Sequence, residues 1–369
     1  MQKEKLVVED FLSEAGVAVN GDNSRDISIY NDGFYKRVLG QGSLGLGESY
    51  MDGWWDCEKL DEFFNHVLRA RLEKKIKNWR VVPALANAIV FNAGNYKRAF
   101  RIGENHYDIG NDLYKAMLDK RMVYTCGYWK TAKNLDEAQE DKLDLICRKI
   151  NLKPGMKILD IGCGWGSFAL FAAEKYGAHV TGITVSKEQV ALGRDLCKGL
   201  PVDIQFKDYR DMEGEFDAIV SIGMFEHVGY KNYGTYMKKV HSLLKDDGVF
   251  LLHTIGGNKS DVSTDSWIDK YIFPGGMIPS IKQIGKSVEN LFVMEDWHNF
   301  GTDYDKTLMA WFANFDSGWG NLKNNYDERF YRMWKYYLLA SAGSFRARKN
   351  QLWQVVLTKH PENGYKRIY

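Results

Sequence analysis

The sequence predicts an α/β protein in which a doubly wound sheet follows a smaller helical domain. The 369 residues exceed what one ordinary core holds, so two domains are the default expectation. From about residue 150, short β-branched segments alternate with helical patterns, as is typical of a doubly wound sheet. The first 95 residues lack this alternation. We therefore expect a helical domain over residues 1–95 and a larger domain over residues 96–369.

Five strands are expected in the larger domain. They are residues 157–161, 179–184, 202–206, 218–223 and 249–255. The helix after the second strand begins with Ser186 and Gln189 in the spacing of a capping box. Residues 256–350 interrupt the sheet pattern as a long insertion, and residues 353–359 are expected to return as an added strand.

Composition excludes several classes of protein. A formal net charge of +2 argues against a nucleic-acid binder. The five cysteines form no CxxC pair and their number is odd, so we expect neither a metal site nor disulfides, and a reducing cytoplasm fits. The N-terminus has no signal-peptide core, and no apolar run reaches the ~18 residues that span a bilayer. Any membrane contact is therefore expected to be peripheral.

A basic segment surrounds the apolar stretch at residues 81–93. It holds nine basic residues: Arg69, Arg71, Lys74, Lys75, Lys77, Arg80, Lys97, Arg98 and Arg101. Two interpretations stay open. The segment is either a solvated helix face with a linker, or an amphipathic surface for anionic lipid headgroups.

A glycine-rich stretch at residues 40–53 predicts turns or close backbone contacts. Gly40, Gly42 and Gly45 have the GxGxxG spacing of a phosphate loop. No apolar strand precedes them, so we reject a phosphate loop here.

The strongest local signal is the segment 160–166 (DIGCGWG), which follows a strand and opens a helix. Glycine at Gly162, Gly164 and Gly166 lets the backbone turn sharply and approach a ligand. With Asp160 two positions upstream, the segment resembles the first motif of class I S-adenosylmethionine methyltransferases. The resemblance implies that this loop packs against the methionine and ribose parts of S-adenosylmethionine.

The positions expected to bind the ribose and the adenine follow the second and third strands, and each allows two interpretations. The second strand ends at Thr184 without the acid that usually holds the ribose hydroxyls. Gln189 is a candidate for that task, although capping explains it nearly as well. Asp208, Tyr209 and Arg210 follow the third strand, where such folds hold the adenine. Tyr209 stacks on the adenine or belongs to a surface turn.

Further motifs resemble the cyclopropane-fatty-acyl-phospholipid synthases over essentially the whole chain. They are residues 45–55 (GLGESYMDGWW), 106–114 (HYDIGNDLY), 124–129 (YTCGYW), 182–189 (GITVSKEQ), 223–229 (GMFEHVG), 253–256 (HTIG), 297–304 (WHNFGTDY) and 345–356. The related mycolic acid cyclopropane synthases share the catalytic half but lack the N-terminal unit. This difference points to phospholipid as the substrate.

The resemblance implies a reaction and its residues. A methylene group from S-adenosylmethionine is added to an acyl-chain double bond, and a bound bicarbonate ion acts as base. Its ligands correspond to Cys126, Glu226, His253, Ile255 and Tyr304, while Tyr124 and Thr125 join the cofactor-binding residues. The resemblance also implies a homodimer in the cytoplasm, with its 1–95 domain on the inner face of a phospholipid bilayer.

The residue types suit this chemistry. Attack of an alkene on the sulfonium methyl leaves a carbocation, which needs a dry site with aromatic faces. Tyr124, Tyr128, Trp129 and Tyr304 are expected to form this wall. Ile255 has no polar side chain, so it and Cys126 are expected to act mainly through backbone N–H groups. Taken alone, Cys126 is more often a buried thiol and His253 a core histidine.

Three rival functions remain. A methyl-branching acyl methyltransferase would use the same cation but resolve it differently. A small-molecule methyltransferase would not need the basic N-terminal region. A non-enzymatic lipid carrier would not need the glycine loop.

Overall fold

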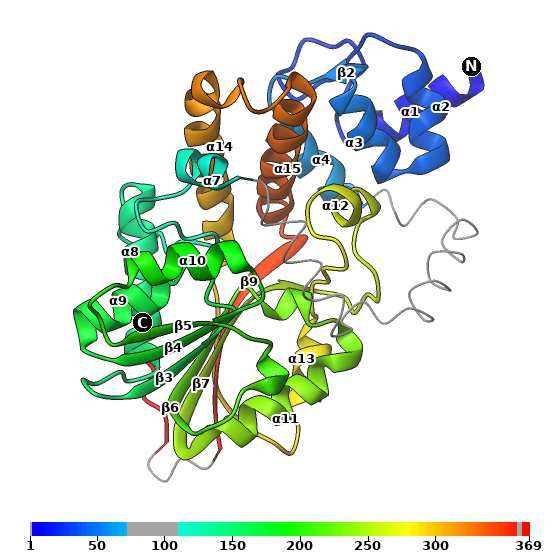
Figure 1. Cartoon of the computed structure of the whole chain (residues 1–369). Coiled ribbons are helices and arrows are strands. Elements are labelled where there is room, and N and C mark those ends of the chain that lie inside the picture. Colours follow the sequence, from blue (N-terminus) through cyan, green and yellow to red (C-terminus); the bar gives the residue numbers. More distant parts are fainter. Residues whose placement is uncertain (1, 72–109, 360–363) are drawn as a thin grey trace.

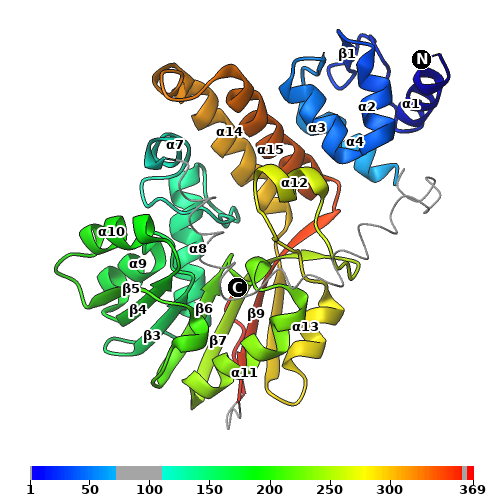
Figure 2. The same cartoon turned by 45° about the vertical axis from the view of Figure 1, so that its right-hand side comes forward.

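The computed structural model describes residues 2–71, 110–359 and 364–369. A sheet with helices on both faces forms one half, and a cap of helices lies above it (Figures 1 and 2). None of the described helices is long and apolar enough to cross a membrane.

The main sheet has seven strands in the order β5-β4-β3-β6-β7-β9-β8. Their bounds are β3 Lys157–Ile161, β4 His179–Thr184, β5 Val202–Phe206, β6 Phe216–Ile222, β7 Leu244–Gly257, β8 Val293–Asn299 and β9 Asn350–Thr358. The first five in spatial order are parallel, and β9 runs antiparallel to both of its neighbours. The predicted fold class, the five strands and the returning strand are confirmed.

Strand β8 was not predicted, because residues 256–350 were interpreted as an insertion outside the sheet. Its sequence, VMEDWHN, mixes acids with apolar residues and so lacks the β-branched signal. It is an edge strand that pairs with β9 alone among the described strands, with a register shift between Met294 and Asp296. An edge strand tolerates this polarity because one side faces no neighbour.

Helices cover both faces of the sheet (Figure 1). One group is α8 Leu135–Lys149, α9 Ser167–Tyr176 and α10 Lys187–Leu196, and the other is α11 Tyr233–Leu243 and α13 Ile281–Val288. Ser186 caps α10 by accepting from the Gln189 N–H at 3.3 Å. The predicted capping box is incomplete, because the Gln189 side chain instead accepts from Thr184 Oγ1 at 2.6 Å.

The cap joins helices from both ends of the chain. From the C-terminal part come α7 Asn111–Met117, α12 Ser266–Tyr271, α14 Thr302–Leu322 and α15 Glu328–Arg346. The N-terminal unit supplies α1 Gln2–Glu14, α2 Gly33–Gln41, α3 Ser43–Met51, α4 Leu60–Arg69 and the short strands β1 Ser28–Ile29 and β2 Trp55–Asp56. One apolar core runs from Val8 in α1 to Phe345 in α15, so the two parts are packed together. The expected boundary at residues 95 and 96 lies outside the described residues.

The glycine-rich stretch forms a turn at Gly42, with φ 59°, and then helix α3. A methyl group on Gly45 would lie 2.4 Å from the Arg37 carbonyl oxygen. One on Gly47 would lie 2.3 Å from the Trp267 ring. Close backbone contacts are therefore confirmed, whereas most of the expected turns are helix.

Candidate active site

The glycine loop between β3 and α9 has the expected geometry. Gly162, Gly164 and Gly166 have φ of 81°, 57° and 82°, a region that residues with a side chain rarely adopt. A methyl group on Gly162 would lie 2.6 Å from the Met224 side chain, whereas one on Gly164 would meet nothing within 4 Å. Gly164 therefore borders open space on the side where a ligand is expected.

A small cavity of ≈ 80 Å³ lies against this loop. Six of the predicted cofactor-binding residues line it: Tyr124, Thr125, Asp160, Gly162, Gly164 and Gln189. Asp160 is buried with no hydrogen-bond partner for its Oδ1, and burial raises its pKa to about 7. The structure thus brings together predicted cofactor-binding residues from three separate segments of the chain, and their role stays a prediction.

The remaining predicted cofactor residues do not line this cavity. Gly166 caps α9, and Thr184 is held by Gln189. Asp208 and Arg210 form an ion pair at 2.7 Å. The Tyr209 ring packs edge-on against Tyr236 at 5.0 Å, so stacking on adenine stays a prediction.

A second, much larger cavity of ≈ 1460 Å³ lies between the cap and the sheet. Side chains from α1, α2, α4, α12 and α15 form much of its wall. Tyr124, Thr125 and Gly223 line both cavities. A ligand in the small cavity would therefore meet a ligand in the large one at this point.

Glu226 stands at the wall of the large cavity, directly after β6. Its Oε1 accepts from the Ile255 backbone N–H at 2.6 Å. Its Oε2 is buried and has no hydrogen-bond partner, and burial raises its pKa to about 7. The Ile255 N–H was expected to bind the ion directly, but Glu226 already occupies it. Ile255 therefore serves the site by holding Glu226.

His253 lies on β7, beside the end of β6. Its Nδ1 is 3.3 Å from the Gln354 amide nitrogen, and its Nε2 is buried without a hydrogen-bond partner. Burial holds the pKa of the imidazole well below its usual value, so the ring is neutral. The Gly223 N–H donates to the His253 carbonyl at 2.9 Å, which ties this strand to the segment carrying Glu226.

Cys126 and Tyr304 complete the predicted ligand set. Cys126 lines neither cavity, and its buried thiol donates to the Gly127 carbonyl at 3.1 Å. Tyr304 lines the large cavity, where its ring packs against Phe345 at 4.6 Å. The structure thus brings Glu226, Ile255 and Tyr304 to the cavity wall and places His253 and Cys126 behind it.

The aromatic wall differs from the prediction. Tyr124 and Tyr304 both pack on Trp311, with ring centroids 5.2 and 5.9 Å apart, respectively. Tyr128 and Trp129 line neither cavity, because the chain turns toward α14 after Gly127. There the Trp129 ring N–H donates to Thr307 Oγ1 at 2.9 Å.

Sequence reasoning missed several residues around these cavities. Tyr337 contributes its hydroxyl to Tyr124, at 2.9 Å, but its helical spacing indicated only core packing. Lys142 lines the small cavity and donates to Thr125 Oγ1 at 2.8 Å. His227 lines the large cavity, and burial lowers its pKa to about 4.

Known proteins resemble this chain along most of its length. Residues 95–355 match the family model described as mycolic acid cyclopropane synthetase. The cyclopropane-fatty-acyl-phospholipid synthase of Escherichia coli K12 is 55% identical over 359 residues, covering 97% of this chain and 94% of that protein. A probable fatty acid methyltransferase of Pseudomonas putida is 38% identical over 273 residues, covering 70% of this chain and 69% of that protein.

A solved structure supports the same relationship. The crystal structure of mycolic acid cyclopropane synthase CmaA1 complexed with SAH and CTAB aligns with a TM-score of 0.67 at 32% sequence identity. It covers 70% of this chain and 98% of that chain. The chain belongs to the mycolic acid cyclopropane synthetase family and is an S-adenosylmethionine-dependent methyltransferase.

Proposed function

We propose that this chain transfers a methylene group from S-adenosylmethionine to the cis double bond of a phospholipid acyl chain and closes a cyclopropane ring. The observation that carries the proposal is the junction of the two cavities at Tyr124, Thr125 and Gly223. The name of the E. coli relative supports a phospholipid substrate, because the similarity to it extends through the N-terminal unit.

The first step needs the cavity junction. The alkene carbon forms a bond to the sulfonium methyl, the carbon–sulfur bond breaks, and its electron pair stays on sulfur. The chain then carries a carbocation. Tyr124 and Tyr304 line the large cavity here and pack on Trp311 behind them, and an aromatic face that borders the cavity can stabilise a desolvated cation by ~2 kcal/mol or more. They also keep out water, which would trap the cation.

The second step needs a proton acceptor. A proton leaves the added methyl group, and the electrons of that C–H bond close the ring. Glu226 Oε2, at the wall of the large cavity, is buried without a partner, and it fits a small ion that can donate a hydrogen bond. Bicarbonate is such an ion and would supply a base when bound. Glu226 would then orient it, whereas contact with the unpartnered His253 Nε2 would need the ring, which lies behind the wall, to reach the cavity.

A methyl-branching reaction is the second candidate. The P. putida relative is named a probable fatty acid methyltransferase, and the same cation would serve that product. The test is mass spectrometry of membrane lipids from cells that express the wild-type chain or the Gly164→Val variant. Acyl chains that gain one CH₂ unit and lose the double bond support the ring. A methyl branch in their place would overturn it.

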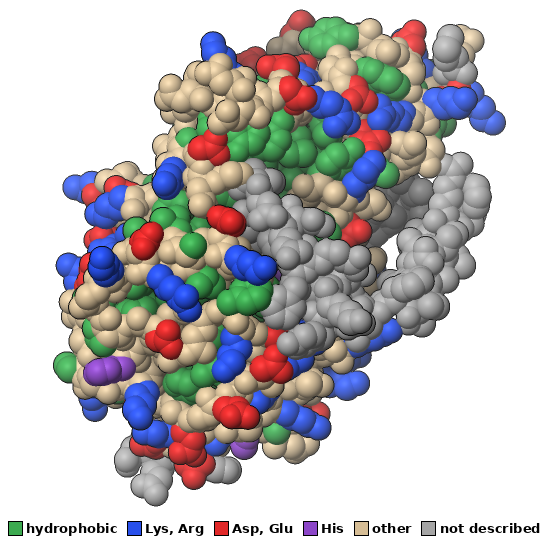
Figure 3. All heavy atoms as spheres, in the orientation of Figure 1, with side chains coloured by type: hydrophobic (Ala, Val, Ile, Leu, Met, Phe, Trp, Pro, Cys, Tyr) green, Lys and Arg blue, Asp and Glu red, His purple; other side chains and the backbone are tan. Residues whose placement is uncertain are grey.

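Peripheral contact with a bilayer also belongs to the proposal. Of the nine basic residues, Arg69 and Arg71 are described, and both line the large cavity. The other seven and the apolar stretch at 81–93 lie outside the described residues. On the face drawn in Figure 3, described basic side chains alternate with acidic ones. We assign bilayer attraction to the segment 69–101 because the nine basic residues lie there on both sides of an apolar stretch. A homodimer on the cytoplasmic face of the membrane completes the proposal.

A further inference from the structure

Lys142 is a buried cation whose charge is not balanced by an ion pair among the described residues. Its side chain in α8 is fully buried. Its ammonium donates to Thr125 Oγ1 at 2.8 Å, the one hydrogen bond that the described residues offer it. The carboxyl groups of Asp119 and Asp160 act on this ammonium electrostatically, but neither forms an ion pair with it, so its one direct partner is neutral. A buried ammonium in this position is stabilised when an anion joins it directly. The side chain borders the small cavity, so a ligand there can provide that anion.

The same cavity also presents a carboxyl group without a full set of partners. Asp160 lines it, and its buried Oδ1 has no hydrogen-bond partner. The cavity thus offers one cation and one acid, each short of partners. The amino-acid end of S-adenosylmethionine carries the complementary pair, an α-carboxylate and an α-ammonium group.

We propose that Lys142 binds the α-carboxylate of the methionine part of the cofactor, together with the Thr125 hydroxyl. Because the ammonium donates to Thr125 Oγ1, the hydroxyl keeps its own proton to donate to the same carboxylate. Asp160 then receives the α-ammonium group. This inference rests on the proposed use of S-adenosylmethionine.

The surroundings of Thr125 hold it in place for this task. Its carbonyl accepts from the Gln139 amide at 2.8 Å. A methyl group on Gly223 would lie 2.6 Å from Thr125 Cγ2, so Gly223 leaves just enough room for this side chain. Thr125 is therefore held by hydrogen bonds from Lys142 and Gln139 and by close packing against Gly223.

Lys149 provides a matched control on the same helix. It is also fully buried, but its ammonium pairs with Asp296 at 3.3 Å and lies 4.4 Å from the centre of the Tyr369 ring. It lines neither cavity. Neutralising it removes a buried charge from α8 without touching the cofactor site.

The experiment is calorimetric titration of the full-length protein with two ligands. S-adenosylhomocysteine keeps the α-carboxylate, and its decarboxylated analogue lacks it. For Lys142→Met, we expect S-adenosylhomocysteine to bind roughly 10- to 100-fold more weakly, the range of a charged hydrogen bond, while the analogue binds as to wild type. Lys149→Met should preserve the wild-type ratio between the two ligands. An equal loss for both ligands in Lys142→Met would make Lys142 structural and overturn the proposal.

The affinities of the wild type for the two ligands test the proposal without any variant. If Lys142→Met does not fold, the wild type must still bind the decarboxylated analogue at least tenfold more weakly than S-adenosylhomocysteine. Equal affinities would overturn the role of Lys142. If the wild type binds S-adenosylhomocysteine but shows no such preference, only this inference fails. If it binds neither ligand, the proposed function fails with it.

Discussion

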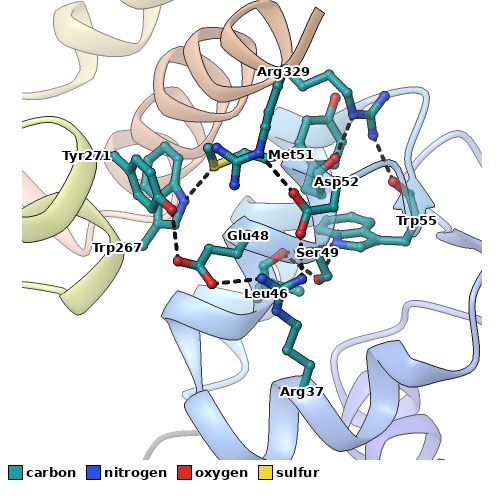
Figure 4. A network of polar contacts seen from close by, with 12 residues as sticks. Arg37, Leu46, Glu48, Ser49, Met51, Asp52, Trp55, Trp267, Tyr271 and Arg329 are labelled. Carbon is teal, nitrogen blue, oxygen red and sulfur yellow. Dashed lines mark hydrogen bonds and ion pairs between the residues drawn. The ribbon is translucent and has the colours of Figure 1, made fainter.

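Two buried regions of this molecule differ in how completely their ionisable side chains are hydrogen-bonded. Where α3 of the N-terminal unit meets α12, Glu48 accepts from Arg37 at 2.8 Å and from the Tyr271 hydroxyl at 2.8 Å (Figure 4). Glu48 also pairs with Lys270. In or directly behind the walls of the two cavities, Glu226 Oε2, His253 Nε2 and Asp160 Oδ1 are buried without hydrogen-bond partners.

The pKa values follow this difference. Hydrogen bonds and charges from Lys270 and Arg37 outweigh burial at Glu48 and lower its pKa to about 2. Burial prevails at Glu226 and Asp160 and raises the pKa of each to about 7. These fully paired charges hold α3 of the N-terminal unit to α12. Incompletely paired charges mark where ligands are expected to complete the site.

The largest expected effect is at Glu226. Glu226→Gln keeps the shape of the side chain but removes its charge and one acceptor. We expect turnover to fall by roughly 10²- to 10⁴-fold, the range of acid–base assistance, with S-adenosylhomocysteine affinity within threefold of wild type. Single-turnover rates and calorimetry measure the two.

Assays with and without bicarbonate distinguish two roles of Glu226, orienting a bicarbonate base or acting as the base itself. If Glu226 orients the ion, added bicarbonate should restore part of the activity of Glu226→Gln, and the wild type should slow in carbonate-free buffer. Undiminished wild-type rates in carbonate-free buffer would rule out bicarbonate as the base and leave Glu226 as the direct one.

The glycine loop should give the next largest effect. Gly164→Val puts a branched side chain at φ 57° and into the open space beside the small cavity. We expect S-adenosylhomocysteine to bind roughly 100-fold more weakly because strain and obstruction act together. Circular dichroism controls for the fold. Unchanged affinity would remove this loop from the cofactor site.

The sequence predicted the sheet better than the surroundings of the site. Strands such as Lys157–Ile161 (KILDI) are short segments rich in β-branched and other apolar residues, and the glycine loop has a fixed spacing, so both are local signals. Lys142 escaped notice because a lysine in an amphipathic helix usually faces solvent. Tyr337 was missed because apolar spacing along a helix does not distinguish a residue of a cavity wall from a core residue. Strand β8 forms by pairing with β9. The two strands begin 57 residues apart, at Val293 and Asn350, so no local pattern in the sequence indicates the pairing.

The contact between α3 and α12 around Glu48 should show a smaller effect, on stability and not on activity. Glu48→Gln removes the charge that Arg37 and Lys270 share and should lower the free energy of unfolding by about 2 kcal/mol at pH 7, the range of a hydrogen bond to a charged group, measured by urea denaturation. Because folding lowers the Glu48 pKa from its ordinary 4.5 to about 2, its contribution is present above pH 4.5 and is lost as the pH falls toward 2. The difference between wild type and Glu48→Gln should therefore shrink over that range. A difference that does not change between pH 6 and 2.5 would show that Glu48 is not held by its charge.

The smallest effect concerns the segment 69–101, most of which lies outside the described residues. A basic side chain near an anionic surface contributes about 1 kcal/mol, and salt screens it. Counting half of the basic residues as reaching the surface, the loss of three lysines costs about 1.5 kcal/mol. The full-length triple variant Lys74→Gln, Lys75→Gln, Lys77→Gln should therefore sediment with anionic vesicles roughly tenfold more weakly at low salt, and the wild type should be released at high salt. The control neutralises Lys133, Lys198 and Lys323, three exposed lysines elsewhere, and has the same change in net charge. If both triple variants lose the same affinity, net charge and not this segment governs membrane contact. If neither loses any, electrostatic attraction is excluded, and insertion of apolar side chains must account for whatever binding remains.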